Sequence, residues 1–573
     1  MRATRLTRHL PRLAVTTALA LSAASAAPAQ GPIVFVDQGS KWGPAPRKDY
    51  YSTDQGSRLI PYSWAKALKT EDGQPFLGDG LVRYGYLPNP QNPDGLPVGF
   101  MVAGPAGRKD LAMNCSACHT RQITVGGTDY RIDGGPALSD FQGFFVGLVA
   151  AVGRVLESDA AFAQFAASVP GAGPDLKDDV TDWYRREQAM VEGSLAGGID
   201  WGYGRLDAVS MIFNRLTGTD IGSGSSRLIR ENIQPAKAPV RYPFLWNAPI
   251  QDRTQWPGFA RNGNDFYGLI RNLGQVYGVF AIYRPRRAFN EVDFLTDNSA
   301  SWKGLERMEG LVQRLGPPKW PWGYKPGLAD QGKALYQANC ASCHGITAGP
   351  YRLTDKFPFF RKTWNTPLCD VGTDAMQYQI LGRSAKSGMF QGVKIPFGAT
   401  LGAETTAFEL LGVSVIGSII QHEFGFSVFR YASTPGAGTL PNKGSKLQQD
   451  IVKDLLATYA PPAPRECGEA GGTTKYESRV LQGIWATAPY LHNGSVPTLA
   501  DLLVRGEDRP KRFSLGRRYS TELIGLAREQ PGSPYSRETT CDKQDGNSRC
   551  GHEYGTKLGD SEKLALLEYL KSL

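Results

Sequence analysis

The sequence predicts a mainly α-helical protein of two domains, with long loops and little β-structure. Three observations support this fold class. The chain has 573 residues, 41% of them hydrophobic, which is enough to bury a core in two or more domains. Its 67 glycines and 39 prolines show no repeat period, a composition that favours long loops. Each half of the chain also carries one copy of the same five-residue motif.

The motif is Cys-x-x-Cys-His, and it ends at His119 in the first copy and at His344 in the second. Two thiols at this spacing add to the two vinyl groups of one porphyrin, and the adjacent histidine binds the iron from the proximal side. A structural metal site or a disulfide is the alternative, but neither needs the histidine. Both copies follow segments that could form the usual preceding helix. The cysteines expected to attach two haem c groups are Cys115, Cys118, Cys340 and Cys343.

The N-terminus has the pattern of a secretory signal. Four arginines up to Arg12 precede an apolar run from Leu13 to Leu21, and small residues up to Ala29 follow it. We expect residues 1–30 to be a cleaved signal peptide, and the mature protein to act in the periplasm or as a secreted protein, where c-type haem is attached. The apolar run is too short to span a bilayer. No other run predicts a transmembrane segment, and residues 408–420 are expected to form a buried helix.

Helical periodicity places a C-terminal haem domain at residues 303–573. Residues 328–338 run directly into the second motif, residues 446–459 follow it, and residues 561–573 end the chain behind Asp560 as N-cap. A first and a last helix that bracket a haem are typical of small c-type cytochromes. The sequence therefore predicts two cytochrome c-like haem domains, the first at residues 31–302.

The N-terminal domain is harder to interpret from its sequence than the C-terminal domain. Residues 111–114 form a short lead into the first motif, and residues 141–156 and 174–195 are expected to be helical. Residues 241–289 are dense in aromatic side chains. Ordinary core packing explains most of these rings, and some are candidates for the wall of a haem pocket.

Four cysteines remain after haem attachment. An even number in an oxidising compartment favours disulfides over reactive thiols. Cys541 and Cys550 flank a turn-rich loop and are the better pair, expected to hold this loop beside His552. Cys369 and Cys467 are far apart in sequence.

The formal charge of +10 includes the signal's arginines and is not gathered into basic runs, which argues against nucleic-acid binding.

The chain has only six histidines, which limits how two irons can be coordinated. A haem with two histidine ligands has both axial positions filled and suits electron transfer, whereas a haem that does chemistry needs an open face. After the two motif histidines and His9 of the signal, three candidates remain for a sixth ligand or an acid–base group. These are His422, His492 and His552. No motif surrounds His422, which favours a surface or supporting role.

Residues 488–499, Ala-Pro-Tyr-Leu-His-Asn-Gly-Ser-Val-Pro-Thr-Leu, together with the two haem motifs and the final helix, resemble the bacterial di-haem cytochrome c peroxidase superfamily. Residues 244–249, 263–265 and 551–555 are most similar to its di-haem rubber oxygenase branch. The resemblance covers most of the chain from about Trp64 onward and is patchy at its start.

The resemblance implies an open first haem. In the peroxidases a second histidine follows the first motif after a short loop, but residues 120–145 contain none here. In the rubber oxygenases dioxygen occupies the open side under an aromatic lid. Phe259 and Phe266 are the candidates for this catalytic lid. Arg131 and Asp133 are expected either to face the haem or to be ordinary loop charges.

For the second haem, the resemblance places the sixth ligand just before the final helix. It is a methionine in typical peroxidases, a tyrosine in the quinone-cofactor-forming relative and a histidine in the rubber oxygenases. No methionine follows Met389, and His552 stands at about this place. We expect His344 and His552 as the axial pair, with a lower reduction potential than a His/Met haem. His492 is the rival, although in the superfamily that histidine lies near the haem edge without binding iron.

Three functions compete. The first is an oxygenase-like oxidoreductase that activates dioxygen at the first haem and oxidises an apolar substrate, with the second haem as electron centre. The second is a peroxidase that reduces hydrogen peroxide with electrons from a small redox protein. The third is an electron-transfer cytochrome without substrate chemistry. The missing methionine and distal histidine favour the first. Calcium, which many peroxidases of the superfamily hold between the haems, is a further candidate cofactor.

Overall fold

The computed structural model describes residues 32–195, 199–345, 364–434, 436–440, 446, 449–450, 452–453 and 474–573. Helices make up 38% of the chain and strands 16%, so the expected mainly helical fold with little β-structure is confirmed only in part. None of the described helices is both long and apolar enough to cross a membrane. The described α-helices are α1 (Pro44–Ser52), α2 (Tyr62–Ala67), α3 (Cys115–Cys118), α4 (Phe141–Val155), α5 (Asp159–Ser168), α6 (Leu176–Leu195), α7 (Ala208–Arg215), α8 (Asp265–Gly278), α9 (Trp302–Val312), α10 (Pro326–Asn339), α11 (Ala341–His344), α12 (Met376–Gln379), α13 (Ala407–Phe424), α15 (Leu499–Leu502) and α16 (Asp560–Ser572).

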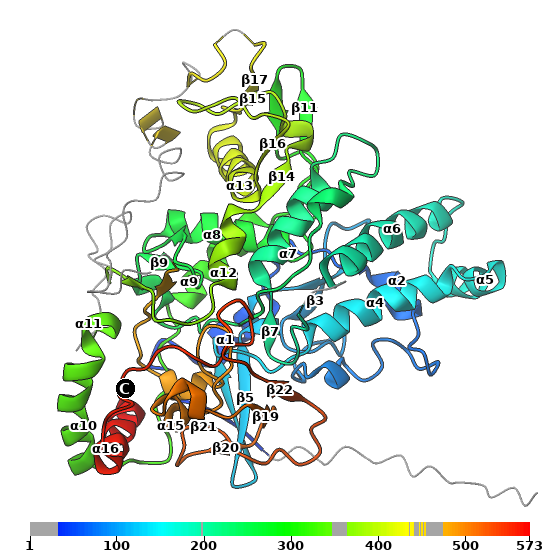
Figure 1. Cartoon of the computed structure of the whole chain (residues 1–573). Helices are drawn as coiled ribbons and strands as arrows, with labels where there is room; N and C mark the ends of the chain where they lie inside the picture. Colours follow the sequence, from blue (N-terminus) through cyan, green and yellow to red (C-terminus); the bar gives the residue numbers. More distant parts are fainter. Residues whose placement is uncertain are drawn as a thin grey trace, which may run out of the picture.

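The strands are short and pair into small separate sheets (Figure 1). Three sheets have more than two strands, in the orders β1-β6-β5, β2-β4-β3 and β11-β12-β17-β15. The described strands are β1 (Ile33–Phe35), β2 (Ile60–Pro61), β3 (Phe100–Ala103), β4 (Asp110–Met113), β5 (Thr120–Val125), β6 (Thr128–Asp133), β7 (Arg205–Leu206), β8 (Val240–Arg241), β9 (Arg253–Thr254), β10 (Ala260–Arg261), β11 (Arg286–Ala288), β12 (Glu291–Asp293), β13 (Leu368–Cys369), β14 (Ser384–Lys386), β15 (Val393–Lys394), β16 (Glu404–Thr406), β17 (Arg430–Tyr431), β18 (Tyr476–Glu477), β19 (Arg512–Ser514), β20 (Tyr519–Ser520), β21 (Gly525–Leu526) and β22 (Ser536–Glu538).

The first motif is preceded by a strand, and the expectation of a helix there is wrong. β4 pairs with β2 and β3, and Asn114 then begins α3 by accepting a hydrogen bond from the backbone N of Ser116 at 2.9 Å. The β5–β6 hairpin follows the motif, where a loop was expected. The second motif has the expected lead, because α10 runs directly into α11.

The three largest hydrophobic cores of the described residues support these elements. One lies around α4 and α6, and another joins α9, the 484–526 region and α16. The third lies between α7, α8 and α13, so residues on both sides of the expected domain boundary at 302/303 share it. That boundary stays a prediction. α13 is the buried helix expected at residues 408–420.

The final helix packs against the helix that leads into the second motif, and Figure 1 shows α10 and α16 side by side. α16 begins at Asp560, one residue earlier than expected, because the backbone N of Gly559 donates to the Glu562 carboxylate at 2.8 Å. Gly332 of α10 faces α16 so closely that an added Cβ would meet the Ala565 carbonyl oxygen and would lie 2.8 Å from Cβ of Tyr569. Glycine is therefore required at this crossing.

The Gly332→Ala variant should be destabilised by about 1–3 kcal/mol, the usual cost of overpacking a tight interface. Gly310→Ala in α9 is the matched control, since nothing lies within 4 Å of an added Cβ there. In that helix interior, alanine should stabilise the chain by about 1 kcal/mol. Denaturant unfolding of the holoprotein followed by circular dichroism measures both changes. Equal midpoints for the two variants would contradict the close crossing.

Candidate haem sites

The first motif presents a proximal histidine in the correct tautomer for a metal. The single turn of α3 places Cys115 and Cys118 one turn apart, and both are free thiols. The Nδ1 atom of His119 lies 2.8 Å from the Pro243 carbonyl oxygen, so Nδ1 carries the proton and Nε2 keeps its lone pair. Burial lowers the pKa of His119 to about 4, which keeps the ring neutral near pH 7.

The second motif repeats this arrangement. Cys340 and Cys343 are also free thiols, and Nδ1 of His344 lies 2.8 Å from the Arg479 carbonyl oxygen. Burial lowers the pKa of His344 as well. The motif faces a cavity lined by Asn339, Cys340, Cys343, His344, Cys369, Val371, Tyr476, Glu477, Ser478, His552 and Tyr554.

His552 faces His344 across this cavity at a distance that fits one iron between them. Their ring centres are 6.1 Å apart. A metal–imidazole bond is about 2 Å long and a ring nitrogen lies about 1 Å from its ring centre, so two histidines on opposite sides of one metal have centres about 6 Å apart. Burial and the nearby rings and cations lower the pKa of His552 to about 3, which leaves its ring neutral. The geometry therefore fits bis-histidine ligation of a haem iron.

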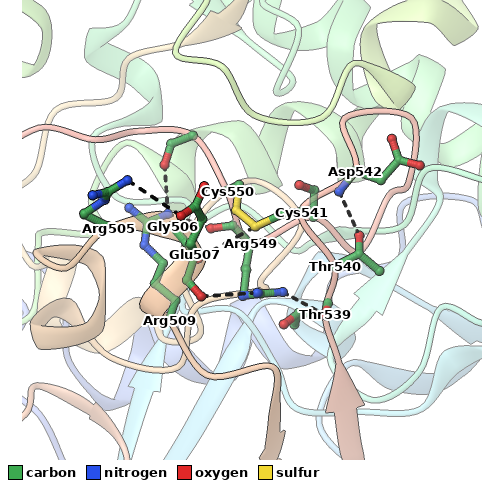
Figure 2. Close-up of a disulfide and its surroundings, with 12 residues drawn as sticks. Arg505, Gly506, Glu507, Arg509, Thr539, Thr540, Cys541, Asp542, Arg549 and Cys550 are labelled. Atoms are coloured by element: carbon green, nitrogen blue, oxygen red, sulfur yellow. Dashed lines mark hydrogen bonds and ion pairs between the residues drawn. A yellow bond between two sulfur atoms is a disulfide. The ribbon is translucent and has the colours of Figure 1, made fainter.

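A disulfide closes the loop that precedes His552, and Figure 2 shows Arg509 beside this disulfide. Cys541 and Cys550 are bonded as expected, with Cα atoms 5.0 Å apart. The buried guanidinium of Arg509 donates to the carbonyl oxygens of Arg549 at 2.6 Å, Gly551 at 2.8 Å and His552 at 3.1 Å. These bonds fix the backbone immediately before and at the histidine.

His552 is also held from the opposite side. Its backbone N donates to the Val371 carbonyl oxygen at 2.7 Å, next to β13. Its φ angle is +53°, in the left-handed region that few residues other than glycine adopt. Local hydrogen bonds thus compensate an unfavourable backbone conformation, as expected where the direction of a side chain matters.

His492 has different partners, which count against it as an iron ligand. Its Nε2 atom lies 2.9 Å from the Asp374 carboxylate, and its ring stacks on Tyr476 with centres 4.1 Å apart. Asp374 also accepts a hydrogen bond from the Asn493 side chain at 2.9 Å. Tyr476 in turn lines the cavity beside the second motif. His492 therefore supports the wall of that cavity, and its Nε2 lies against a carboxylate.

No other histidine in the described part of the chain contacts His119. His422, the last of the candidates, stacks on Trp302 with ring centres 4.0 Å apart, which is the supporting role expected for it. The ring of Tyr242 packs edge-on against His119, with centres 5.9 Å apart. In the described part of the chain, a second histidine thus faces the motif histidine at the second motif but not at the first.

An apolar cavity of about 110 Å³ lies between α8 and α13, close to the first motif. α8 reaches the motif through Gln55, which accepts from the backbone N of Cys115 at 2.9 Å and donates to Asn272 of α8 at 2.6 Å. Arg271, the neighbouring residue, lines the cavity, and its charge lowers the pKa of both Cys115 and His119. The cavity is lined by Ile212, Gln255, Phe259, Ala260, Arg261, Tyr267, Ile270, Arg271, Gly274, Gln275, Phe408, Leu411, Gly412, Val415 and Ile416.

The two aromatic lid candidates occupy different positions. Phe259 lines the cavity and packs edge-on against Phe408 of α13, with ring centres 5.5 Å apart. Phe266 is not among the lining residues, and its ring packs against Tyr267 at 6.0 Å. The role of each ring as a lid stays a prediction.

Two buried arginines supply positive charge that the described protein residues do not neutralise. Arg121 is 1% exposed and donates only to the Pro136 carbonyl oxygen, at 3.3 Å. The Nη1 atom of Arg241 has no hydrogen-bond partner in the described residues. Burial and the nearby guanidiniums of Arg479 and Arg121 lower the pKa of Arg241 to about 9. Buried unpaired cations are costly, so an anion is expected here, and the carboxylates of haem propionates would fit.

The remaining expectations have mixed outcomes. The Asp133 carboxylate is bound within the protein, accepting from Trp42 at 2.8 Å and from Tyr51 at 2.6 Å. Arg131 is likewise engaged by Gln122 at 2.7 Å. Cys369 is disulfide-bonded. Cys467, the signal segment 1–30 and nine of the fourteen residues of the expected helix 446–459 lie outside the described residues.

The expectation of a calcium ion between the haems stays a prediction. In the described part of the chain no group of three or more His, Cys, Asp or Glu side chains is placed to hold a metal ion. The site residues that sequence reasoning missed are Arg479, Asp374, Arg509 and the carbonyl of Pro243. A buried arginine beside the second motif had no sequence signal, and backbone carbonyls carry none.

Comparisons with known proteins match two segments of the C-terminal half, one of which contains the second motif. Residues 475–514 match a family described as RoxA-like, cytochrome c-like, and residues 327–405 match cytochrome c oxidase, cbb3-type, subunit III. The uncharacterized protein y4iJ of Sinorhizobium fredii (strain NBRC 101917 / NGR234) is 28% identical over 608 residues, covering 93% of this chain and 92% of that protein. The uncharacterized protein y4iM of the same strain is 26% identical over 361 residues, 59% of this chain and 66% of its own. The C-terminal half thus carries cytochrome c-like segments, which imply covalently bound haem c with iron and a redox role for the chain.

Proposed function

We propose that this chain is a periplasmic or secreted di-haem oxidoreductase that activates dioxygen at its N-terminal haem and oxidises an apolar substrate. The C-terminal haem serves as its electron centre. The observation that carries the proposal is the asymmetry of the two motifs. His344 faces His552 at 6.1 Å, whereas no described histidine faces His119.

A haem with one axial position open supplies dioxygen activation, and the protein supplies the surroundings. Pro243 orients the His119 ring through its carbonyl, and Arg121 and Arg241 provide the charge that haem propionates require. The match of residues 475–514 to a family described as RoxA-like, cytochrome c-like supports a haem c redox protein.

The substrate class follows from the cavity between α8 and α13. Its wall is built mainly from aliphatic and aromatic side chains, and four polar residues lie among them: Gln255, Arg261, Arg271 and Gln275. Apolar pockets with few polar groups bind apolar molecules by excluding water. An alkene such as a polyisoprene segment is the class we propose.

The experiment that tests this function compares two assays on the purified holoprotein. Oxygen consumption with polyisoprene, together with carbonyl-containing cleavage products, is the expected result. Rapid oxidation of a reduced small cytochrome by hydrogen peroxide, without any reaction with polyisoprene, would establish the peroxidase alternative in its place. Inactivity in both assays would favour the third function, an electron-transfer cytochrome without substrate chemistry.

Phe259→Ala should reduce kcat/KM for the apolar substrate by about tenfold or more, because it removes a large contact surface from the cavity wall. The change is expected mainly in KM, since the lost contact is made to the bound substrate. Phe266→Ala is the matched control, because this ring is not part of the lining. Equal rates for the two variants in the oxygen-consumption assay would show that this cavity is not the substrate site.

A further inference from the structure

The two proximal histidines are connected to each other through Arg479. The Nδ1 atom of His344 lies 2.8 Å from the carbonyl oxygen of Arg479. The guanidinium of the same residue donates through Nη2 to the Phe244 carbonyl oxygen at 2.7 Å. Pro243, the residue before Phe244, accepts from Nδ1 of His119 at 2.8 Å. One residue therefore joins the supports of both imidazoles.

The guanidinium of Arg479 is held in one position. It is buried, at 4% exposure, and pairs with Glu477 at 2.8 Å. It also lies over the Phe244 ring, 4.2 Å from the ring centre. Glu477 is fixed in turn by Gln251, whose side-chain N donates to it at 3.2 Å. A charge-assisted hydrogen bond in such a setting is strong and well oriented.

These contacts form an unbroken chain of covalent and hydrogen bonds from one imidazole to the other. It runs from His119 through the Pro243–Phe244 peptide and the Arg479 side chain and backbone to His344. Each non-covalent step is a hydrogen bond of 2.7–2.8 Å. Electrons tunnel more readily along bonded atoms than across gaps between side chains.

We propose that Arg479 is the positioning residue that couples the two haem sites, and that electrons pass between them along this bonded chain. This inference rests on the proposed presence of two haems. In each transfer the C-terminal haem iron is oxidised from ferrous to ferric and the N-terminal iron is reduced from ferric to ferrous. One electron moves, and no bond is made or broken in the chain. A small one-electron redox protein would then return one electron to the C-terminal haem.

Two substitutions distinguish the effect of the hydrogen bond from Arg479 to Phe244 from the effect of the positive charge of Arg479. Arg479→Gln removes the cation and the bond to Phe244 but keeps the backbone carbonyl that orients His344. Arg479→Lys keeps the cation but not the planar fork that reaches both Phe244 and Glu477. Arg215→Gln is the matched control, because Arg215 is equally buried and pairs with Glu187 at 2.9 Å, away from both motifs.

The measurement is intramolecular electron transfer in the holoprotein after pulse radiolysis, with the potential of each haem determined by spectroelectrochemistry. The rate should fall severalfold in both Arg479 variants and stay unchanged in Arg215→Gln. The potentials should fall in Arg479→Gln, because a nearby cation that favours the ferrous state is lost, and stay near wild type in Arg479→Lys. If both Arg479 variants bind two haems and keep the wild-type rate, the proposed role of Arg479 is wrong and the proposed function is unaffected. A pyridine haemochrome assay that finds a single haem would overturn the proposed function as well.

Discussion

In the His552→Ala variant, one of the two haems should change from low-spin to high-spin. The 6.1 Å separation of the His344 and His552 rings leaves room for one iron between them, so the variant opens one axial position. Loss of a strong imidazole donor should also raise the reduction potential of this haem. Absorption and electron paramagnetic resonance spectra of the oxidised protein measure the change in spin state.

His492→Ala is the matched control for this ligand. Its ring pairs with Asp374 and stacks on Tyr476, so both haems should keep their spin states in this variant. The opposite pattern, with a new high-spin signal for His492→Ala and none for His552→Ala, would reverse the assignment of the sixth ligand.

Replacing the cysteines of one motif at a time should halve the covalently bound haem in each case. The Cys340→Ala/Cys343→Ala variant should retain the haem that binds carbon monoxide, because the first motif is intact. The Cys115→Ala/Cys118→Ala variant should retain only the bis-histidine haem and bind no carbon monoxide when reduced. Haemochrome spectra after extraction of non-covalent haem give the stoichiometry. Full haem content in either variant would show that the altered motif does not attach haem.

The parts of this molecule that depend on local chemistry were predictable from sequence. The Cys-x-x-Cys-His motif is recognisable from its spacing alone. The turn-rich loop between Cys541 and Cys550 predicted that these cysteines pair, close to His552. The periodicity of apolar residues predicted α10 and α16, the helices beside the C-terminal site. α10 buries one face, with Ala329, Gly332 and Tyr336, whereas α16 is buried on all sides over residues 565–570.

The β5–β6 hairpin was missed although a signal for it exists. Gly126 and Gly127 have positive φ angles of 57° and 83°, as a tight hairpin turn requires, and strand-forming residues flank them. The sheet partner of β4 had no such signal, because its pairing with β2 joins segments distant in sequence.

The contacts that support the candidate sites were beyond sequence reasoning for a different reason. Pro243 and Arg479 act through backbone carbonyls, which every residue has, and each meets a histidine more than a hundred positions away. The unpaired state of Arg121 and Arg241 is likewise visible only once their burial is known.

Carbon monoxide titration of the fully reduced holoprotein tests most directly whether one haem is open and the other closed. The account predicts one carbon monoxide bound for every two haems in wild-type protein, and two in His552→Ala. Binding to neither haem of the wild type would contradict an open site at His119, and binding to both would contradict the axial pair of His344 and His552.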